Sequence, residues 1–98
     1  MGLTVRLQDE RGKSESESDI GIDFRIPTGD SCFRLLCYID PYGDTIFNQL
    51  QMGTFLAEWE KIRGEAKTED ETAAWSGVKQ LATRCMNQVH LYLRFIGD

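Results

Sequence analysis

The chain has 98 residues, of which 41% are hydrophobic, so it is long enough to fold as one domain around a single core. Sixteen acidic and eleven basic residues give a net charge of −5, and the basic residues are scattered, which disfavours a nucleic-acid-binding protein. No apolar run approaches the roughly 20 residues that cross a bilayer, so no membrane association is expected.

The cysteines and the first residues of the chain bear on its compartment. Three cysteines are an odd number, and all lie in apolar surroundings, which is typical of buried, reduced thiols. The first nine residues alternate between apolar and polar types and do not form the apolar block of a signal peptide. The sequence therefore predicts a cytoplasmic protein.

A strand and a polar loop are predicted first along the chain. Leu3, Val5 and Leu7 alternate with polar residues, which predicts a half-buried strand over residues 2–8. Residues 9–19 are polar throughout, and their alternating serines and glutamates offer nothing to bury. We expect a mobile loop here, within a single domain that spans residues 1–98.

The next two strands are predicted to form a hairpin. Apolar residues alternate over residues 20–26, and residues 27–30 have the composition of a turn. Residues 32–39 are almost continuously apolar, which is typical of a strand covered on both faces. We expect this segment to be the central strand, paired antiparallel with the preceding one. A turn at residues 40–44 ends it, and residues 45–47 add a short extension.

Two helices follow the turn. Apolar residues recur at helical spacing from Gln49, and Gly64 is placed to end this helix. Glu58 is expected on the solvent-exposed face, paired with the lysine three residues further on. The second helix begins with a capping box, in which Thr68 is the N-cap and Glu71 is the third helical residue.

The end of the second helix is ambiguous. A helix that continues to Ile96 leaves two large apolar residues facing water and overruns the predicted strands. A helix that stops near Asn87 frees residues 89–96 to form a closing strand, which we favour. The predicted fold is therefore α+β: an antiparallel sheet of three to four strands with two helices packed on one face. Trp59 and Trp75 are expected between the helices and the sheet.

The candidate ligand-binding residues are Asp40, Tyr42, Asp44 and Asp98. Asp40, Tyr42 and Asp44 lie in the predicted turn, and Asp30 and Asp98 are expected near the same end of the sheet. Carboxylates gathered in this way could hold a divalent cation, but the loop lacks the dense alternation of a calcium loop. Aspartates that cap a turn are the simpler interpretation, so we predict no metal and no cofactor.

The cysteines and the histidine are not predicted to form a reaction centre. Cys32 and Cys37 would point to opposite faces of a strand, so they are poorly placed to share a zinc ion. Cys85 lies on the apolar stripe of a helix, and a pair with His90 lacks a third group to orient the base. The sequence also has no phosphate-binding or hydrolase motif, and we do not expect an enzyme.

Three stretches carry a resemblance to known proteins: YIDPYGDTIFN, LQMGTFLAEWEKI and HLYLRFIGD. Over about residues 36–98 the chain resembles a group of small bacterial proteins with an Asp-Pro-Tyr-Gly-Asp turn, a helix and a C-terminal Tyr-Leu-x-Phe-Ile-Gly-Asp sequence. In size and acidity these proteins are similar to immunity proteins of bacterial toxin systems and to products of mobile gene cassettes. The resemblance implies a bacterial cytoplasm and a closing strand, and it implies no catalytic residues.

Three functional hypotheses follow from these features. The first is a non-enzymatic interaction module, of an immunity or regulatory type, whose acidic balance favours a basic partner protein. The second is a small-molecule or metal-binding domain that uses the turn at residues 40–44. The third is a homo-oligomer that pairs through an exposed sheet edge, either the first strand or the closing strand. We rank the interaction module first.

Overall fold

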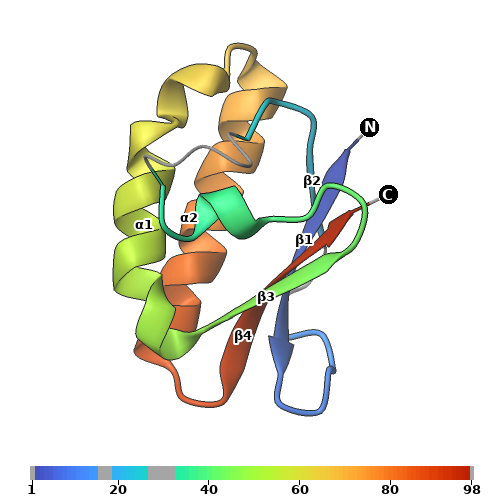
Figure 1. Cartoon of the computed structure of the whole chain (residues 1–98), viewed down its shortest axis with the longest axis vertical. Coiled ribbons are helices and arrows are strands. Elements are labelled where there is room, and N and C mark those ends of the chain that lie inside the picture. The colour runs from blue at the N-terminus through green and yellow to red at the C-terminus, as the bar shows by residue number, and fades with distance from the viewer. Residues whose placement is uncertain (1, 16–18, 27–32, 98) are drawn as a thin grey trace.

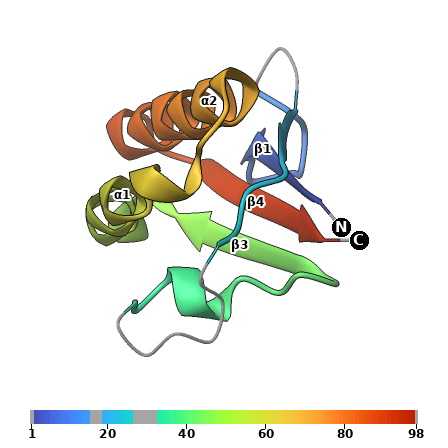
Figure 2. The same cartoon turned by 90° about the horizontal axis from the view of Figure 1, so that it is seen from above.

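A four-stranded antiparallel sheet forms one layer of the fold, and two helices cover one of its faces (Figure 1). The computed structural model describes residues 2–15, 19–26 and 33–97. Its elements are β1 (Leu3–Asp9), β2 (Ile20–Ile22), η1 (Leu36–Tyr38), β3 (Asp44–Asn48), η2 (Gln49–Gln51), α1 (Met52–Lys61), η3 (Arg63–Glu65), α2 (Glu69–Asn87) and β4 (Leu91–Gly97), where η denotes a 3₁₀ helix. Seen from above, both α-helices lie on the same side of the sheet (Figure 2). The predicted α+β class is confirmed.

The first and last strands along the chain are the two central strands of the sheet. They pair antiparallel over their whole length, starting with Leu3 opposite Gly97, and the strand order is β2-β1-β4-β3. Alternation turns one set of side chains toward the helices, and these are buried: Val5, Leu7, Leu91, Leu93 and Phe95. The strands predicted at residues 2–8 and 89–96 are confirmed. The prediction that either of them is an edge is wrong, because each has a neighbour on both sides.

The helix before β4 ends at Asn87, as predicted. The backbone then reverses through His90, whose φ of 65° lies in the left-handed region. This left-handed residue is three positions after the last residue of the helix.

Residues 32–39 do not form the predicted central strand. Cys32 lies outside the described residues, and the rest of the segment contains η1 and no strand. The predicted hairpin is also wrong, because β2 pairs antiparallel with β1. The chain instead reaches the sheet again at residues 44–48, where the predicted short extension after the turn is strand β3, paired with β4.

A buried carboxylate explains why this segment is not a strand. Glu58 of α1 accepts hydrogen bonds from the backbone N–H groups of Arg34, Leu35 and Leu36, at 2.8, 3.0 and 3.0 Å. These N–H groups therefore bond to a helix side chain and not to a neighbouring strand. Leu36 and Ile39 are buried in the core. The prediction that Glu58 faces solvent is wrong, since it is only 5% exposed.

Capping boxes begin α2 and the 3₁₀ helix η2 that leads into α1. Thr68 and Glu71 form the predicted box at the start of α2, with the Glu71 N–H 3.1 Å from Thr68 Oγ1. A second box, between Asn48 and Gln51, begins the η2–α1 segment. Gly64 does not act as the predicted C′ residue, because it lies within η3. None of the described helices is long and apolar enough to cross a membrane.

Two tryptophans join the helices to each other. The indole N–H of Trp59 donates to the backbone carbonyl of Trp75 at 3.0 Å, and the indole N–H of Trp75 donates to the carbonyl of Trp59 at 2.9 Å. Trp59 also contacts the sheet through Phe95, as expected for a residue between the layers. Arg63 and Lys79 lie over the Trp75 ring, at 5.6 and 5.5 Å from its centroid. This reciprocal pair fixes the spacing of α1 and α2.

The described part of the predicted polar loop folds back on β1. Asp9 Oδ1 accepts hydrogen bonds from the backbone of Arg11 and Lys13, both at 2.9 Å. Gly12, with φ of 85°, makes the tight turn between them. The N–H of Glu15 then donates to Leu7 O at 2.7 Å. Residues 16–18, which belong to the predicted mobile loop, lie outside the described residues.

Candidate functional site

The two described aspartates of the predicted ligand site are both bound within the protein. Asp40 Oδ1 accepts a hydrogen bond from the Tyr42 N–H at 2.9 Å, which caps the turn. Asp44 forms an ion pair with Arg94. Asp30 and Asp98 lie outside the described residues. The described carboxylates therefore stabilise the turn and its junction with β4.

A backbone hydrogen bond and an ion pair join the turn to the end of β4. The Gly97 N–H donates to Gly43 O at 2.7 Å, beside the Asp44–Arg94 ion pair. A Cβ atom on Gly97 would lie 2.5 Å from the carbonyl of Pro41, so only glycine allows this close approach. The turn and the C-terminal strand, which both belong to the stretches that resemble known proteins, therefore lie against each other. Their contacts stabilise the fold.

The thiols and the imidazole do not converge in the described residues. Cys37 Sγ is 3.7 Å from Arg34 O, and Cys85 Sγ is 3.4 Å from Leu91 O. Burial raises the pKa of the Cys85 thiol to about 11, so it stays protonated at neutral pH. His90 is exposed and faces Glu10 at 3.3 Å. No group of three metal-ligating side chains exists among residues 2–15, 19–26 and 33–97.

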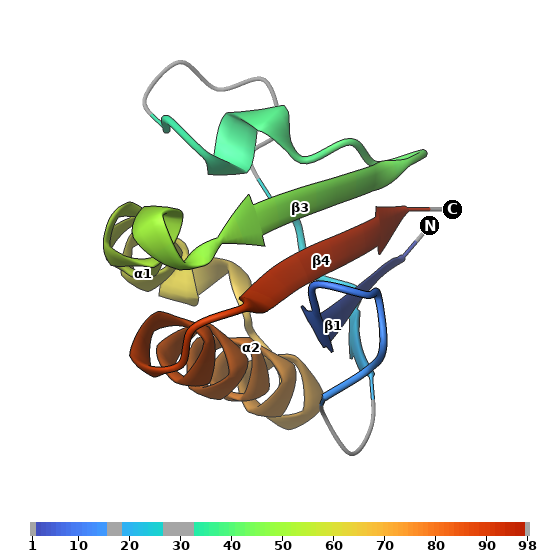
Figure 3. The same cartoon turned by 90° about the horizontal axis from the view of Figure 1, so that it is seen from below.

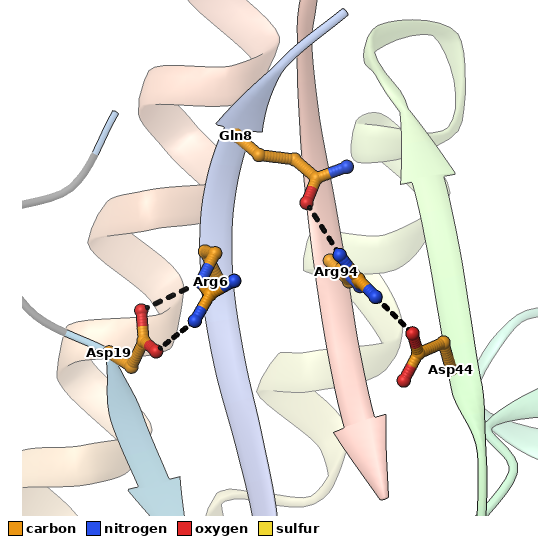
Figure 4. Close-up of polar contacts among 5 residues, drawn as sticks. All are labelled: Arg6, Gln8, Asp19, Asp44 and Arg94. Carbon is orange, nitrogen blue, oxygen red and sulfur yellow. Dashed lines mark hydrogen bonds and ion pairs between the residues drawn. The ribbon is translucent and has the colours of Figure 1, made fainter. Parts of the chain in front are cut away.

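The face of the sheet opposite the helices carries a row of paired charges (Figure 4). Arg6 of β1 lies directly opposite Arg94 of β4, which places two like charges side by side. Arg6 donates to Asp19 at 3.1 Å from Nε and at 2.7 Å from Nη2. Arg94 donates to Asp44 and, at 3.4 Å, to Gln8. The two carboxylates offset the repulsion between the arginines, and the row is neutral overall.

The Arg6–Asp19 pair gives a small pH-dependent contribution to stability. The hydrogen bonds from Arg6 hold the pKa of Asp19 below its ordinary value of 3.8. A lowered folded-state pKa stabilises the fold above the ordinary pKa, and this stabilisation is lost as the pH falls through the folded value. We expect Asp19→Asn to lower the melting temperature slightly at neutral pH, and we expect this difference to shrink as the pH falls through the folded-state pKa of Asp19. Thermal unfolding of both proteins across this range checks the prediction, and a difference independent of pH would contradict it.

Exposed large hydrophobic side chains concentrate beside β3. In the part of the chain that the structure describes, they are Tyr38, Tyr42, Ile46, Leu50, Met86 and Val89. The first four follow one another along η1, the turn, β3 and η2, and we call these four residues the β3 border. Met86 is next to its end, because the Gln49 side chain donates to Met86 O at 2.9 Å. The border ends at a shallow pocket of about 220 Å³, lined by Leu50, His90 and Tyr92 among others.

The β3 border lies on one margin of the molecule and in an acidic segment. β3 is an edge strand, and η1 with the chain to the turn lies beyond it, on the side away from β4 (Figure 3). Between residues 35 and 60 the sequence has four acidic residues and no lysine, arginine or histidine. This border was not predicted from the sequence, because Tyr38 was expected inside a buried strand and residues 45–47 were expected to be only a short extension after the turn. No known protein family, curated protein or solved structure matches this chain.

Proposed function

We propose that the protein is a non-enzymatic protein-interaction module that binds a basic partner protein through the β3 border. The proposed role is of an immunity or regulatory type in a bacterial cytoplasm, where a small acidic protein sequesters its partner. We propose neither a nucleic-acid partner nor membrane association for this protein.

The distribution of exposed hydrophobic residues supports this proposal most directly. Leu50 is 91% exposed, Tyr42 is 71% exposed and Ile46 is 51% exposed. They lie in consecutive segments of the chain, with Ile46 opposite Arg94 in the register of β3 and β4. Isolated exposed hydrophobic residues are ordinary, but a group of them on one side is typical of a binding surface. The charged row next to Ile46 on the open face is internally neutralised, so we expect the hydrophobic side chains to make the main contacts with the partner.

The net charge of the chain supports a basic partner. The whole chain carries −5. Of the four acidic residues between positions 35 and 60, Asp44 and Glu60 form ion pairs and Glu58 is buried, so the border's own carboxylate is that of Asp40. A partner with basic residues around an apolar patch would complement both the charge and the hydrophobicity of this margin. Because such attraction is screened by ions, we expect binding to weaken as the salt concentration rises.

We expect Ile46→Asp to remove the partner in affinity capture from the native host. The substitution places a carboxylate in the middle of the border, and it should lower partner recovery at least about tenfold. Quantitative mass spectrometry of proteins captured on immobilised wild type and variant measures the change. The half-exposed position of Ile46 on an edge strand leaves the core intact, which circular dichroism verifies.

Gln80→Asp is the matched control. Gln80 is exposed on α2, which packs against α1 and over β1, β2 and β4, and the substitution changes the net charge by the same amount. A partner that is retained by the control and lost from Ile46→Asp supports the proposal. Equal recovery by wild type and both variants would contradict binding through the border.

A small-molecule-binding domain at the turn is the second candidate, and a pocket favours it. A cavity of about 320 Å³ is lined by Pro41 of the turn together with Leu3, Ile22, Asp23 and Phe24 among others, and Asp40, Tyr42 and Asp44 are not part of its lining. A ligand here should raise the melting temperature in proportion to its occupancy of the native state. A metabolite and metal panel that leaves the melting temperature unchanged would contradict this function.

A further inference from the structure

We infer that the cavity between the start of β1, the chain after β2 and the turn binds a small zwitterion with an apolar side chain, of the class of the free apolar α-amino acids. This inference rests on the second function proposed above, a small-molecule-binding domain, and it names the class of ligand. The site is separate from the β3 border.

The cavity has the size and the lining of a small-molecule site. It lies at the end of the sheet that holds both chain termini (Figure 1) and has a volume of about 320 Å³. Ligand sites in proteins start at about 300 Å³, and they are mostly apolar with a few polar groups. Because a water molecule has a share of about 30 Å³ in the liquid, this cavity has room for roughly ten non-hydrogen atoms. Its apolar lining residues come from three separate segments: Leu3, Ile22, Phe24, Ile26 and Pro41.

One carboxylate and one guanidinium belong to the same lining, and both are free. The side chains of Asp23 and Arg25 form no hydrogen bond or ion pair with another described residue. The Asp23 carboxylate lies beside the start of β1, because a Cβ atom on Gly2 would be 3.2 Å from Asp23 Oδ1. By contrast, Arg6 and Arg94 on the open face are each paired with an aspartate. The cavity therefore presents one uncompensated charge of each sign.

The backbone beside these two residues is also unpaired. β2 ends at Ile22, and its ladder with β1 stops there. The N–H and C=O groups of residues 24–26 form no hydrogen bond with the rest of the described chain. Phe24 and Ile26 are nevertheless buried, and Phe24 packs on Trp59 with 5.9 Å between the ring centroids. Apolar side chains thus hold the segment in place, and its backbone donors and acceptors are left for water or a ligand.

The two charges select the class of ligand. An anion without a cationic group would be repelled by Asp23, and a cation without an anionic group would be repelled by Arg25. A zwitterion places its ammonium against Asp23 and its carboxylate against Arg25, which can hold the carboxylate with two parallel hydrogen bonds. The two residues are two positions apart, which puts their Cα atoms at most about 7 Å apart, so one small molecule can reach both. The apolar side chain of the ligand then covers the apolar lining.

An NMR titration of the isotope-labelled protein with leucine, methionine and phenylalanine tests the inference. We expect at least one of them, at millimolar concentration, to shift the amide signals of residues 22–26 and to raise the melting temperature. The amine and the carboxylic acid that correspond to the tightest binder each lack one charge, and they should bind at least about tenfold more weakly. No shift with any of the three amino acids, or equal binding of the single-charge analogues, would overturn the inference.

Two variants test the charges of the protein. Asp23→Asn and Arg25→Gln should each weaken amino-acid binding at least about tenfold. Both positions are exposed, so the core should stay intact, which circular dichroism verifies. Glu69→Gln and Arg11→Gln are the matched controls, since they remove exposed charges that do not line the cavity, and they should bind like the wild type. Equal binding by the wild type and all four variants would overturn the inference.

Failure of this inference can be told apart from failure of the proposed functions. A metabolite without paired opposite charges that shifts the signals of residues 22–26, when the amino acids do not, keeps the small-molecule function and removes the zwitterion class. No response to the amino acids or to the wider panel removes both. The partner surface is tested separately, because Asp23→Asn and Arg25→Gln leave the β3 border unchanged and should retain the captured partner.

Discussion

Replacing Glu58 by alanine is expected to lower the free energy of unfolding by about 3 kcal/mol. The carboxylate accepts three backbone hydrogen bonds, from Arg34, Leu35 and Leu36, in a site where Glu58 is buried. Removing it leaves these donors without an acceptor, and each unsatisfied buried donor costs roughly 1–3 kcal/mol. Urea unfolding of the variant measures the loss, and amide hydrogen exchange should show that residues 34–36 lose protection first.

Two comparison variants make this prediction specific. Glu60→Ala removes the neighbouring exposed glutamate, whose ion pair with Lys79 is on the surface, and should cost less than about 1 kcal/mol. Glu58→Gln should fall between the two alanine variants. Its remaining oxygen can serve Leu35 and Leu36, which share Oε1 of Glu58, but its amide cannot accept from Arg34. Equal stability of the Glu58→Ala and Glu60→Ala proteins would show that the carboxylate does not hold this segment.

Gly97→Ala is expected to destabilise the protein by about 2–3 kcal/mol through overpacking. The added Cβ would lie 2.5 Å from the carbonyl carbon and oxygen of Pro41 and 2.8 Å from Asp40 O. These are backbone atoms of a capped turn, so they cannot rotate away as a side chain could. The shift would also strain the 2.7 Å hydrogen bond from Gly97 to Gly43. Chemical unfolding measures the loss.

The same substitution at Gly53 should have the opposite sign. Gly53 lies within α1, has no positive φ, and a Cβ there would meet nothing within 4 Å. Alanine at such a site is expected to stabilise the helix by roughly 0.5–1 kcal/mol. If both variants lowered stability alike, contact with the turn would not be the cause of the Gly97 effect.

Local signals predicted much of this fold. The capping box of Thr68 and Glu71 depends on residues three apart, and the strand at residues 2–8 depends on alternation within one segment. The end of α2 near Asn87 was predicted because a helix that continued to Ile96 would be longer than the strands it covers. Each of these features is decided by neighbours in the sequence, so the sequence carries the information directly.

Non-local contacts account for the errors. Residues 33–39 have the composition of a buried strand, but the carboxylate that binds their backbone comes from Glu58, more than twenty residues later. A signal was present, since Glu58 follows Phe55 by three positions and precedes Ile62 by four, and both are buried. The strand order could not be deduced from adjacency, because β4 inserts between β1 and β3.

The candidate site was only partly visible in the sequence. Asp40 and Tyr42 were correctly predicted to lie in a turn, whereas Asp44 is the first residue of β3, and both described carboxylates bond within the chain. The β3 border could not be found before the edge strand was known. Ile46 and Leu50 become a surface only because β3 has a single neighbouring strand among the described residues, and sequence patterns do not encode which strand that is.

The position of β4 has a consequence for how the protein assembles during synthesis. Until β4 leaves the ribosome, β1 can pair only with the three residues of β2, and β3 has no strand beside it among the described residues. A two-stranded pairing of that size is marginal in water. We therefore expect most of the sheet to form only after β4 has been synthesised. Since the closing step joins residues as distant as Leu3 and Gly97, refolding should be slower than for a helical protein of this length.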